Sequence, residues 1–288
     1  MGFTPSSYDN ISSCMCQRHY MVYLKNELVY DIYQKGKNMQ KLFDINEEGF
    51  SVRCKLFFNK DIHDIKEIVI ATHGFGGFKD NKSIERFGDK ITSKNKKFGV
   101  ICFDWPCHGQ DARKKLVLEE CLTYLRLVVK YAKEILKADK IYNYSVSFGA
   151  YLTLKYINDN ENPFNKIALR SPGIRMYEAV MDSISEEDLG KLSKGKEITL
   201  GRDRLIKISQ EFLDELKDND ITKYEFFDYA DDILMIHGLK DEMIPVAYSE
   251  EFAEANVIEL IEVEKADHRF TNPQQLDFAI QKIIDFFS

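Results

Sequence analysis

The chain of 288 residues carries 40 basic and 47 acidic side chains, which give a net charge of −7, and 44% of its residues are hydrophobic. This composition is typical of a globular protein with a sizeable core and argues against a disordered chain. An acidic chain without a basic block is a poor candidate for binding nucleic acid or an anionic membrane surface, and no apolar run approaches the roughly 18–20 residues of a membrane-spanning helix.

The N-terminus and the cysteines indicate a cytoplasmic protein. The first residues, MGFTPSSYDNISSCMC, lack the basic and then apolar pattern of a secretory signal. All six cysteines lie at or before position 121, so a disulfide framework would leave more than half of the chain unbridged. Free thiols in a reducing compartment are the better interpretation. Cys14 and Cys16 have no second ligand pair at zinc spacing, so we expect no metal there.

Residues 1–40 look like an appendage to the main domain, and their structure is open to two interpretations. Apolar residues recur at helical spacing from Met21 to Ile32, which favours an amphipathic helix. Leu28, Tyr30 and Ile32 also alternate, which favours a strand. The pattern leaves open whether this segment extends a cap, packs against a sheet or mediates a homodimer.

Short apolar runs separated by helical patterns follow along the rest of the chain. Two strands, 41–46 and 50–58, are expected around a Glu-Glu-Gly turn. Later runs are nearly all apolar, which suits strands covered on both faces of a parallel sheet. These runs are 67–72, 99–103, 140–144, 166–169, 233–236 and 257–263. The clearest helix spans 113–136. This alternation predicts an α/β fold, with a mostly parallel central sheet flanked by helices and right-handed crossovers.

One stretch interrupts the alternation. Residues 172–231 lack a convincing buried strand and show helical patterns at 186–189 and 202–216. Insertions of this size are usually functional lids or separate decorations. We interpret 172–231 as a cap over the carboxyl edge of the sheet, where ligands bind in such folds, and 41–171 together with 232–288 as the core domain. The apolar side of the 202–216 helix suggests room for an acyl or aryl group of modest size.

The segment IYNYSVSFGAYL indicates a reactive serine. A strand enters it, a helix leaves it, and Ser147 lies at the junction in the pattern Ser-x-Ser-x-Gly. Except for Ser145, this is the nucleophile elbow G-x-S-x-G, whose tight turn needs small residues two positions before and after the serine. Ser145 itself would have Asn143 and Ser147 at those positions, which is a worse fit. Taken alone, a serine in such a turn is more often a helix N-cap than a nucleophile.

A glycine-rich turn, THGFGG, follows the apolar run 67–72. Here the chain resembles the α/β-hydrolase family, in which an H-G-x-G-G-type turn supplies half of an oxyanion hole. The resemblance implies that the backbone N–H groups of Phe75 and of Phe148 would face the negative oxygen of a tetrahedral intermediate. A phosphate-binding loop is the alternative, but a dinucleotide motif would need glycine in place of Lys79, and the Gly-Lys-Ser/Thr of a Walker loop is missing.

Two later segments resemble the remaining catalytic motifs of the family. The segment ILMIHGLKD resembles a strand followed by H-G-x-x-D, which implies Asp241 as the triad acid, with Glu242 as its nearest rival. The segment EKADHRF resembles the histidine loop of the family and implies His268 as the base. The order Ser147, Asp241, His268 is the order that the α/β-hydrolase fold dictates.

The turn DWPCHG corresponds to the D-x-x-G-H-G turn of the family, with Cys107 in place of a small residue. His108 competes with His268 as the base, but it precedes the nucleophile, and this turn is structural in relatives. Cys107 is interpreted as a packed free cysteine rather than a reactive thiol. His73 and His237 occupy motif positions that shape loops.

Together these motifs predict a serine carboxylester hydrolase, most similar to bacterial carboxylesterases near the feruloyl (cinnamoyl) esterases and the monoacylglycerol lipases. The resemblance implies that His268 deprotonates Ser147, that Asp241 orients His268, and that an acyl-enzyme intermediate forms and is hydrolysed. It also implies a small-molecule ester as the partner and no metal or organic cofactor. A thioesterase or acyltransferase with the same triad, or a non-catalytic binding protein on this fold, is an open alternative.

Overall fold

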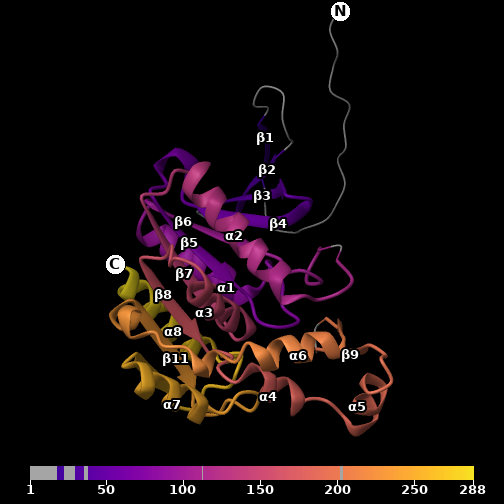
Figure 1. Ribbon diagram of the computed structural model, residues 1–288. Helices are drawn as coiled ribbons and strands as arrows, with labels where there is room; N and C mark the ends of the chain where they lie inside the picture. Colours follow the sequence, from indigo (N-terminus) through magenta and orange to yellow (C-terminus); the bar gives the residue numbers. More distant parts are fainter. Residues whose placement is uncertain (1–17, 23–29, 36–37, 112, 202–203) are drawn as a thin grey trace, which may run out of the picture.

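The computed structural model describes residues 18–22, 30–35, 38–111, 113–201 and 204–288 (Figure 1). Cys14, Cys16 and the middle of the pattern between Met21 and Ile32 lie outside these residues. The four cysteines that are described, Cys54, Cys102, Cys107 and Cys121, are buried free thiols. No helix in the described ranges is long and apolar enough to cross a bilayer.

A ten-stranded sheet runs through the described part of the chain. From edge to edge its strands are β1 (Arg18–Val22), β2 (Tyr30–Lys35), β3 (Asn38–Glu47), β4 (Phe50–Phe58), β6 (Phe98–Phe103), β5 (Glu67–Thr72), β7 (Lys140–Val146), β8 (Lys166–Arg170), β11 (Ile233–Gly238) and β12 (Glu259–Val263). The first four strands pair antiparallel, and the six from β6 to β12 are parallel to one another. The expected α/β fold with a mostly parallel sheet flanked by helices is confirmed.

Both faces of the parallel strands are buried, because successive side chains point to opposite sides. In β5, Ile68 and Ile70 belong to one hydrophobic cluster, whereas Val69 and Ala71 belong to another. The first cluster includes apolar faces of α2 (Leu118–Glu134), α3 (Phe148–Asp159) and α7 (Val246–Asn256), and the second those of α1 (Lys82–Lys94) and α8 (Pro273–Phe287). The carboxyl ends of the parallel strands therefore meet at one edge between two helical layers.

Near the N-terminus the structure decides between the two interpretations of the pattern. Residues 30–35 form β2, which pairs with β1 and β3, so the strand alternative is right for Tyr30 and Ile32 and the helical one is wrong there. The next hairpin joins β3 to β4 through Glu48 and Gly49, both at positive φ. A two-residue turn of this kind matches the twist of its strands. Strand β4 has the predicted bounds, and β3 is longer than predicted.

The segment between β8 and β11 contains more strand than its sequence pattern indicates. It comprises α4 (Met176–Met181), α5 (Glu186–Leu192), β9 (Ile198–Leu200), β10 (Ile206–Ile208), α6 (Gln210–Asp218) and the 3₁₀ turns η2 (Ile221–Lys223) and η3 (Phe227–Asp232). Residues 202 and 203 of the predicted helix 202–216 lie outside the described residues. The prediction is wrong from 204 to 209, because Ile206 and Ile208 pair with β9 and the Ser209 side chain caps the helix that follows. Figure 1 shows α4, α5, β9 and α6 extending beyond the end of the sheet.

Two other predicted elements begin later in the structure. The helix expected at 113–136 starts at Leu118, and the strand expected at 257–263 starts at Glu259. Val257 is left-handed, with φ of 58°, and ends α7 instead of joining β12. Apolar residues at an element boundary fit both a helix end and a strand start, so periodicity alone does not separate them.

Candidate active site

Ser147 lies in a strained turn between β7 and α3. Its φ of 54° and ψ of −118° are conformations that a residue with a side chain rarely adopts. Its carbonyl oxygen accepts hydrogen bonds from Ala150, Tyr151 and Gly173 N–H groups, which hold the turn. Ser147 occupies the N-cap position of α3, but its hydroxyl makes no capping hydrogen bond to the helix. The side chain is instead free to face the carboxyl edge of the sheet.

The turn is tight because neighbouring backbone presses against it. A Cβ on Gly149 would overlap the Thr72 hydroxyl and lie 2.8 Å from the His73 carbonyl oxygen. A Cβ on Gly74 would lie 3.0 Å from the Ser147 Cβ. The crowding around the predicted elbow is therefore present, and it comes from the loop that follows β5.

Ser145, which stands where the elbow motif has its first glycine, is fully buried beneath the turn. Its hydroxyl donates to Asn143 Oδ1 at 2.6 Å and accepts from Thr72 Oγ1 at 2.8 Å, and it lies 2.8 Å from Thr153 Oγ1. The extra hydroxyl thus sits in a polar cluster that satisfies it. Ser145 has no contact with His268, which leaves Ser147 as the better candidate nucleophile.

The structure brings together the three side chains that the sequence singles out. His268 Nε2 lies 3.0 Å from Ser147 Oγ, and His268 Nδ1 lies 2.7 Å from Asp241 Oδ2. The loops that carry them follow β12 and β11, two adjacent strands whose carboxyl ends lie at the same edge as the Ser147 turn. Ser171 donates a hydrogen bond to the His268 carbonyl oxygen at 3.0 Å and holds the histidine loop.

Both carboxylate oxygens of Asp241 accept two hydrogen bonds each. Its Oδ1 accepts hydrogen bonds from the Met243 and Ile244 backbone, and its Oδ2 accepts from both His268 and His237. Burial opposes ionisation of the carboxyl, but hydrogen bonds from the two histidines and the backbone outweigh it and hold the pKa of Asp241 well below its ordinary value. Asp241 is therefore charged at every pH at which the protein is expected to work.

The predicted oxyanion donors are the backbone N–H groups of Phe75, in the loop after β5, and of Phe148, at the start of α3. The rings of Phe75 and Phe148 meet edge to face with centroids 5.8 Å apart. Neither backbone N–H has an acceptor within the described residues. Phe148 is the first residue of α3, where N–H groups have no partner inside the helix and the helix dipole favours negative charge. The assignment of both groups as oxyanion donors stays a prediction.

Asp104 ties the Phe75 loop to the next loop. Its carboxylate accepts hydrogen bonds from the backbone N–H of Lys79 at 2.7 Å and of Gln110 at 2.9 Å. A Cβ on Gly109 would overlap this carboxylate. The turn DWPCHG therefore has a structural role beneath the site.

His108 and Cys107 make no hydrogen bond to Ser147, His268 or Asp241 within the described residues. Burial lowers the pKa of His108 to about 3, and its Nδ1 lies 2.8 Å from the Pro106 carbonyl oxygen. Burial raises the pKa of the Cys107 thiol to about 12, so it carries no reactive thiolate. Glu242, the rival acid, is exposed and makes no contact with His268. These residues do not compete for the roles predicted for His268, Ser147 and Asp241.

The segment between β8 and β11 packs against the helix that follows Ser147 and against the loop after β5. The Phe212 ring of α6 meets Phe148 edge to face at 6.3 Å, and the Tyr151 hydroxyl of α3 donates to the Asn219 carbonyl oxygen at 3.0 Å. The Arg204 carbonyl oxygen lies only 3.3 Å from the position of a Cβ on Gly76. Ser147 and His268 are each only 7% exposed.

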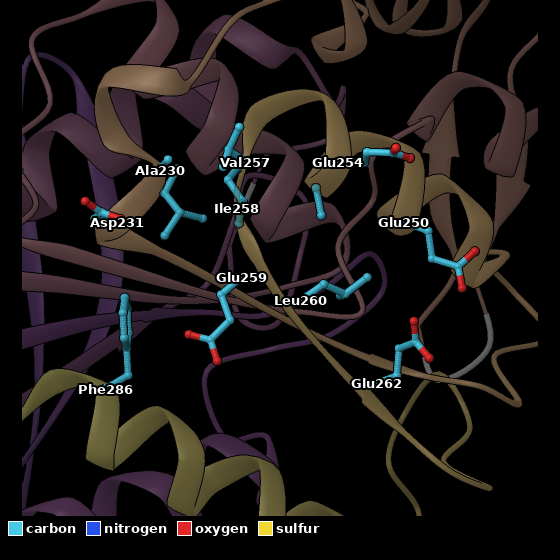
Figure 2. A pocket seen from close by; sticks show the side chains of 12 residues that line it. Ala230, Asp231, Glu250, Glu254, Val257, Ile258, Glu259, Leu260, Glu262 and Phe286 are labelled. Carbon is cyan, nitrogen blue, oxygen red and sulfur yellow. The ribbon is translucent and has the colours of Figure 1, made fainter.

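A hollow lies elsewhere, beside the edge strand β12. This acidic groove has a volume of about 620 Å³ and is lined by twelve residues, five of them carboxylates (Figure 2). The carboxylates are Asp231, Glu250, Glu254, Glu259 and Glu262. Its lining includes no serine, cysteine or histidine and none of the predicted site residues. Within the described ranges, no group of three or more His, Cys, Asp or Glu side chains is arranged to hold a metal ion.

Comparison with known proteins finds likeness in structure and not in sequence. No protein-family model and no curated protein matches the chain. A structure of Est1E from Butyrivibrio proteoclasticus with ferulic acid bound superposes with a TM-score of 0.70 at 18% identity, over 85% of this chain and 97% of that one. The monoacylglycerol lipase of Paleococcus ferrophilus gives a TM-score of 0.60 at 18% identity, over 82% and 98%.

Mouse alpha/beta hydrolase domain-containing protein 10 gives a TM-score of 0.63 at 16% identity, over 85% of this chain and 98% of that one. At these identities the likeness establishes the fold and not the reaction. The chain has the α/β-hydrolase fold, as the resemblance of its motifs implies.

Proposed function

We propose that the protein is a serine hydrolase that cleaves carboxylic acyl esters. One observation carries the proposal: the hydrogen-bonded chain from Ser147 through His268 to Asp241, with the serine in a strained turn at the carboxyl edge of the sheet. A nucleophile, a base within reach of it and a third group that orients the base are the signature of covalent catalysis.

In the first step Ser147 Oγ attacks the ester carbonyl carbon while His268 Nε2 takes the hydroxyl proton. The carbonyl π electrons move to oxygen, and the resulting oxyanion accepts hydrogen bonds from the Phe75 and Phe148 N–H groups. One such donor contributes about 3–4 kcal/mol to stabilisation of the transition state in well-studied hydrolases. The Asp241 carboxylate keeps the His268 Nδ1 proton in place and stabilises the imidazolium.

In the second step the tetrahedral intermediate collapses, and His268 gives its proton to the departing alcohol. Water then enters and transfers a proton to His268 as its oxygen attacks the acyl-enzyme. In the second tetrahedral intermediate the bond between Ser147 Oγ and the acyl carbon breaks, His268 returns its proton to Oγ, and the carboxylic acid leaves. The scheme uses only protein groups and water.

The proposal gives residues 172–231 the role of a cap. Support comes from Phe212 packed on Phe148 and from the approach of Arg204 to Gly76, which join this segment to both predicted oxyanion donors. Since Ser147 is almost completely buried, the cap moves to admit substrate. The apolar packing favours an acyl or aryl group over a charged one. Two structural neighbours, Est1E with ferulic acid bound and a monoacylglycerol lipase, support the same substrate class.

The experiment is hydrolysis of p-nitrophenyl acetate, butyrate and octanoate and of methyl ferulate by the purified protein. The Ser147→Ala variant is expected to lose activity by a factor of 10³ or more, as is typical when a nucleophile is removed. Ser193→Ala is the matched control, because Ser193 is exposed and remote from the elbow. A folded wild type without activity on any ester would contradict the proposal, and thioesters would be tested next.

The free buried thiols support the cytoplasm as the place of the reaction.

A further inference from the structure

Two imidazoles donate to one carboxylate oxygen at the site. His268 Nδ1 lies 2.7 Å from Asp241 Oδ2, and His237 Nε2 lies 2.9 Å from the same atom. The reaction scheme above uses only the first of these contacts. His237 is fully buried near the carboxyl end of β11, so its ring contacts protein groups and not solvent.

The neighbours of His237 assign its proton. Its Nε2 faces two acceptors, Asp241 Oδ2 and the Ile244 carbonyl oxygen at 3.1 Å, so Nε2 carries hydrogen. Its Nδ1 lies 2.7 Å from the Ser249 hydroxyl on α7, which is also fully buried. A hydroxyl can donate to this nitrogen, so the arrangement accommodates a neutral ring in the Nε2–H tautomer, and we assign that tautomer to His237.

Neutrality of this ring matters for the reaction. A protonated His237 would neutralise Asp241 before substrate arrives, and His268 would lose the charge that stabilises its imidazolium. The other charged groups close by lie on the surrounding elements. Glu262 lies opposite His237 on β12, and Glu250 and Glu251 follow Ser249 on α7. Lys240 and Glu242 flank Asp241, and Arg175, the residue before α4, pairs with Glu251. The lysine and the glutamates are exposed and Arg175 is partly so, whereas Asp241 is the charged group in direct contact with the ring.

We propose that His237 is a positioning residue for the Ser147 reaction: a neutral imidazole, locked by Ser249, that fixes Asp241 Oδ2 toward His268 and moderates how strongly the carboxylate holds the His268 proton. This inference rests on the proposed function. A carboxylate that shares its charge with a second donor attracts the proton on His268 less strongly. Loss of the His237 N–H therefore makes His268 more basic and lets Asp241 turn.

The test compares His237→Leu with His237→Gln, whose amide nitrogen can replace Nε2 as a donor. Rates of p-nitrophenyl acetate hydrolysis are measured from about pH 5 to 9. His237→Gln should keep kcat within about threefold of wild type, and His237→Leu should lose about 10–100-fold, the range seen when groups that orient a catalytic side chain are removed. The rising limb of the pH–rate profile should move to higher pH in His237→Leu alone, and KM should change little in either variant.

Ser249→Ala should show a smaller loss in the same direction, because the ring stays but its tautomer is no longer fixed. His63→Gln is the matched control, since His63 is exposed and distant in the fold, and it should leave the profile unchanged. A folded His237→Leu with reduced kcat but a wild-type pH limb would overturn the proposal, because a purely structural role predicts that result.

A second measurement does not depend on the variants folding. Long-range ¹H–¹⁵N NMR of the wild type distinguishes a protonated from an unprotonated ring nitrogen, and we expect hydrogen on Nε2 and none on Nδ1 of His237. An imidazolium, or hydrogen on Nδ1, would overturn the inference. If the wild type hydrolyses no ester, the proposed function fails and the role of His237 fails with it. An active wild type with a pH limb insensitive to His237→Leu rejects this inference alone.

Discussion

The closed edge around Ser147 and the acidic groove beside β12 differ in their exposure and in how their side chains are arranged. The groove is open, has a volume of about 620 Å³ and gathers five carboxylates, which do not meet at one point: Figure 2 shows Glu250, Glu254 and Glu262 on one side and Asp231 and Glu259 on the other. At Ser147 the side chains converge within hydrogen-bond distance and only 7% of the serine is exposed. Because a candidate nucleophile, base and acid converge at Ser147, we propose this edge, and not the more highly charged groove, as the reactive region.

The largest expected difference is in kcat, between a variant of Asp241 and a variant of a carboxylate in the groove. Asp241→Asn should lower kcat by roughly 10⁴, because an amide facing His268 Nδ1 favours the wrong tautomer of the base. Glu259→Gln, in the groove, should leave kcat within about twofold, as is usual for surface changes away from a site. Steady-state kinetics of both variants on p-nitrophenyl butyrate make the comparison. Equal losses in the two variants would contradict our assignment of the reactive edge.

Buried histidines behind the edge should make the stability depend on pH, and the groove has none. Burial lowers the pKa of His73 to about 4 and that of His108 to about 3. Since these folded values lie below the unfolded value of about 6.5, the unfolded state binds more protons, and stability is lost as the pH falls from about 6.5. At pH 5 each histidine should cost about 2 kcal/mol.

Urea unfolding at pH 7.5 and pH 5 measures this loss for the wild type, His108→Gln and His63→Gln. His108→Gln should reduce the difference between the two pH values by about 2 kcal/mol, and His63→Gln should leave it unchanged. A difference that His108→Gln does not reduce would show that His108 is protonated in the folded state.

Because the elbow is crowded, replacing its glycine by alanine should change the stability of the fold differently from the same change at an open position. Gly149→Ala should destabilise the fold by about 2–4 kcal/mol, because its Cβ would overlap Thr72 and press on the His73 carbonyl. In Gly190→Ala, on the exposed helix α5, the new Cβ meets nothing within 4 Å. Alanine in a helix should stabilise that variant by up to about 1 kcal/mol. Thermal unfolding of both tests the contrast, and equal shifts would contradict it.

The smallest expected effect concerns Ser145, the departure from the elbow motif. Ser145→Ala removes a hydroxyl that bonds with Thr72, Asn143 and Thr153, and it should lower the free energy of unfolding by about 1–2 kcal/mol. Because Ser145 does not contact His268, kcat should stay within about threefold of wild type, as for other changes that spare the reacting groups. Activity lost without a loss of stability would instead make Ser145 part of the chemistry.

The sequence predicts most of the parallel sheet because its strands are short apolar runs with no competing period. Strands β4 and β5 match their predicted bounds, and the motifs predict Ser147, His268 and Asp241, which lie together. The start of α6 could not be predicted, because Ile206 and Ile208 fit a helical stripe as well as the strand that they form with β9.

The contacts of His237 and Ser145 could not be predicted either. Both depend on residues from other strands and helices, Ser249 on α7 and Thr72 on β5, and no local pattern encodes such pairs. The motif H-G-x-x-D was the one available signal for His237, since it places the histidine four residues before Asp241.

The most direct test of a nucleophilic Ser147 is labelling with an alkyl fluorophosphonate, followed by intact-protein and peptide mass spectrometry. Ser147 Oγ forms a bond to phosphorus, the phosphorus–fluorine bond breaks, and His268 takes the hydroxyl proton as fluoride leaves. We expect one adduct per chain, on the peptide that contains Ser147, absent from Ser147→Ala and strongly slowed in Asp241→Asn. A folded wild type that takes up no label, or a label located on Ser145, would contradict the account.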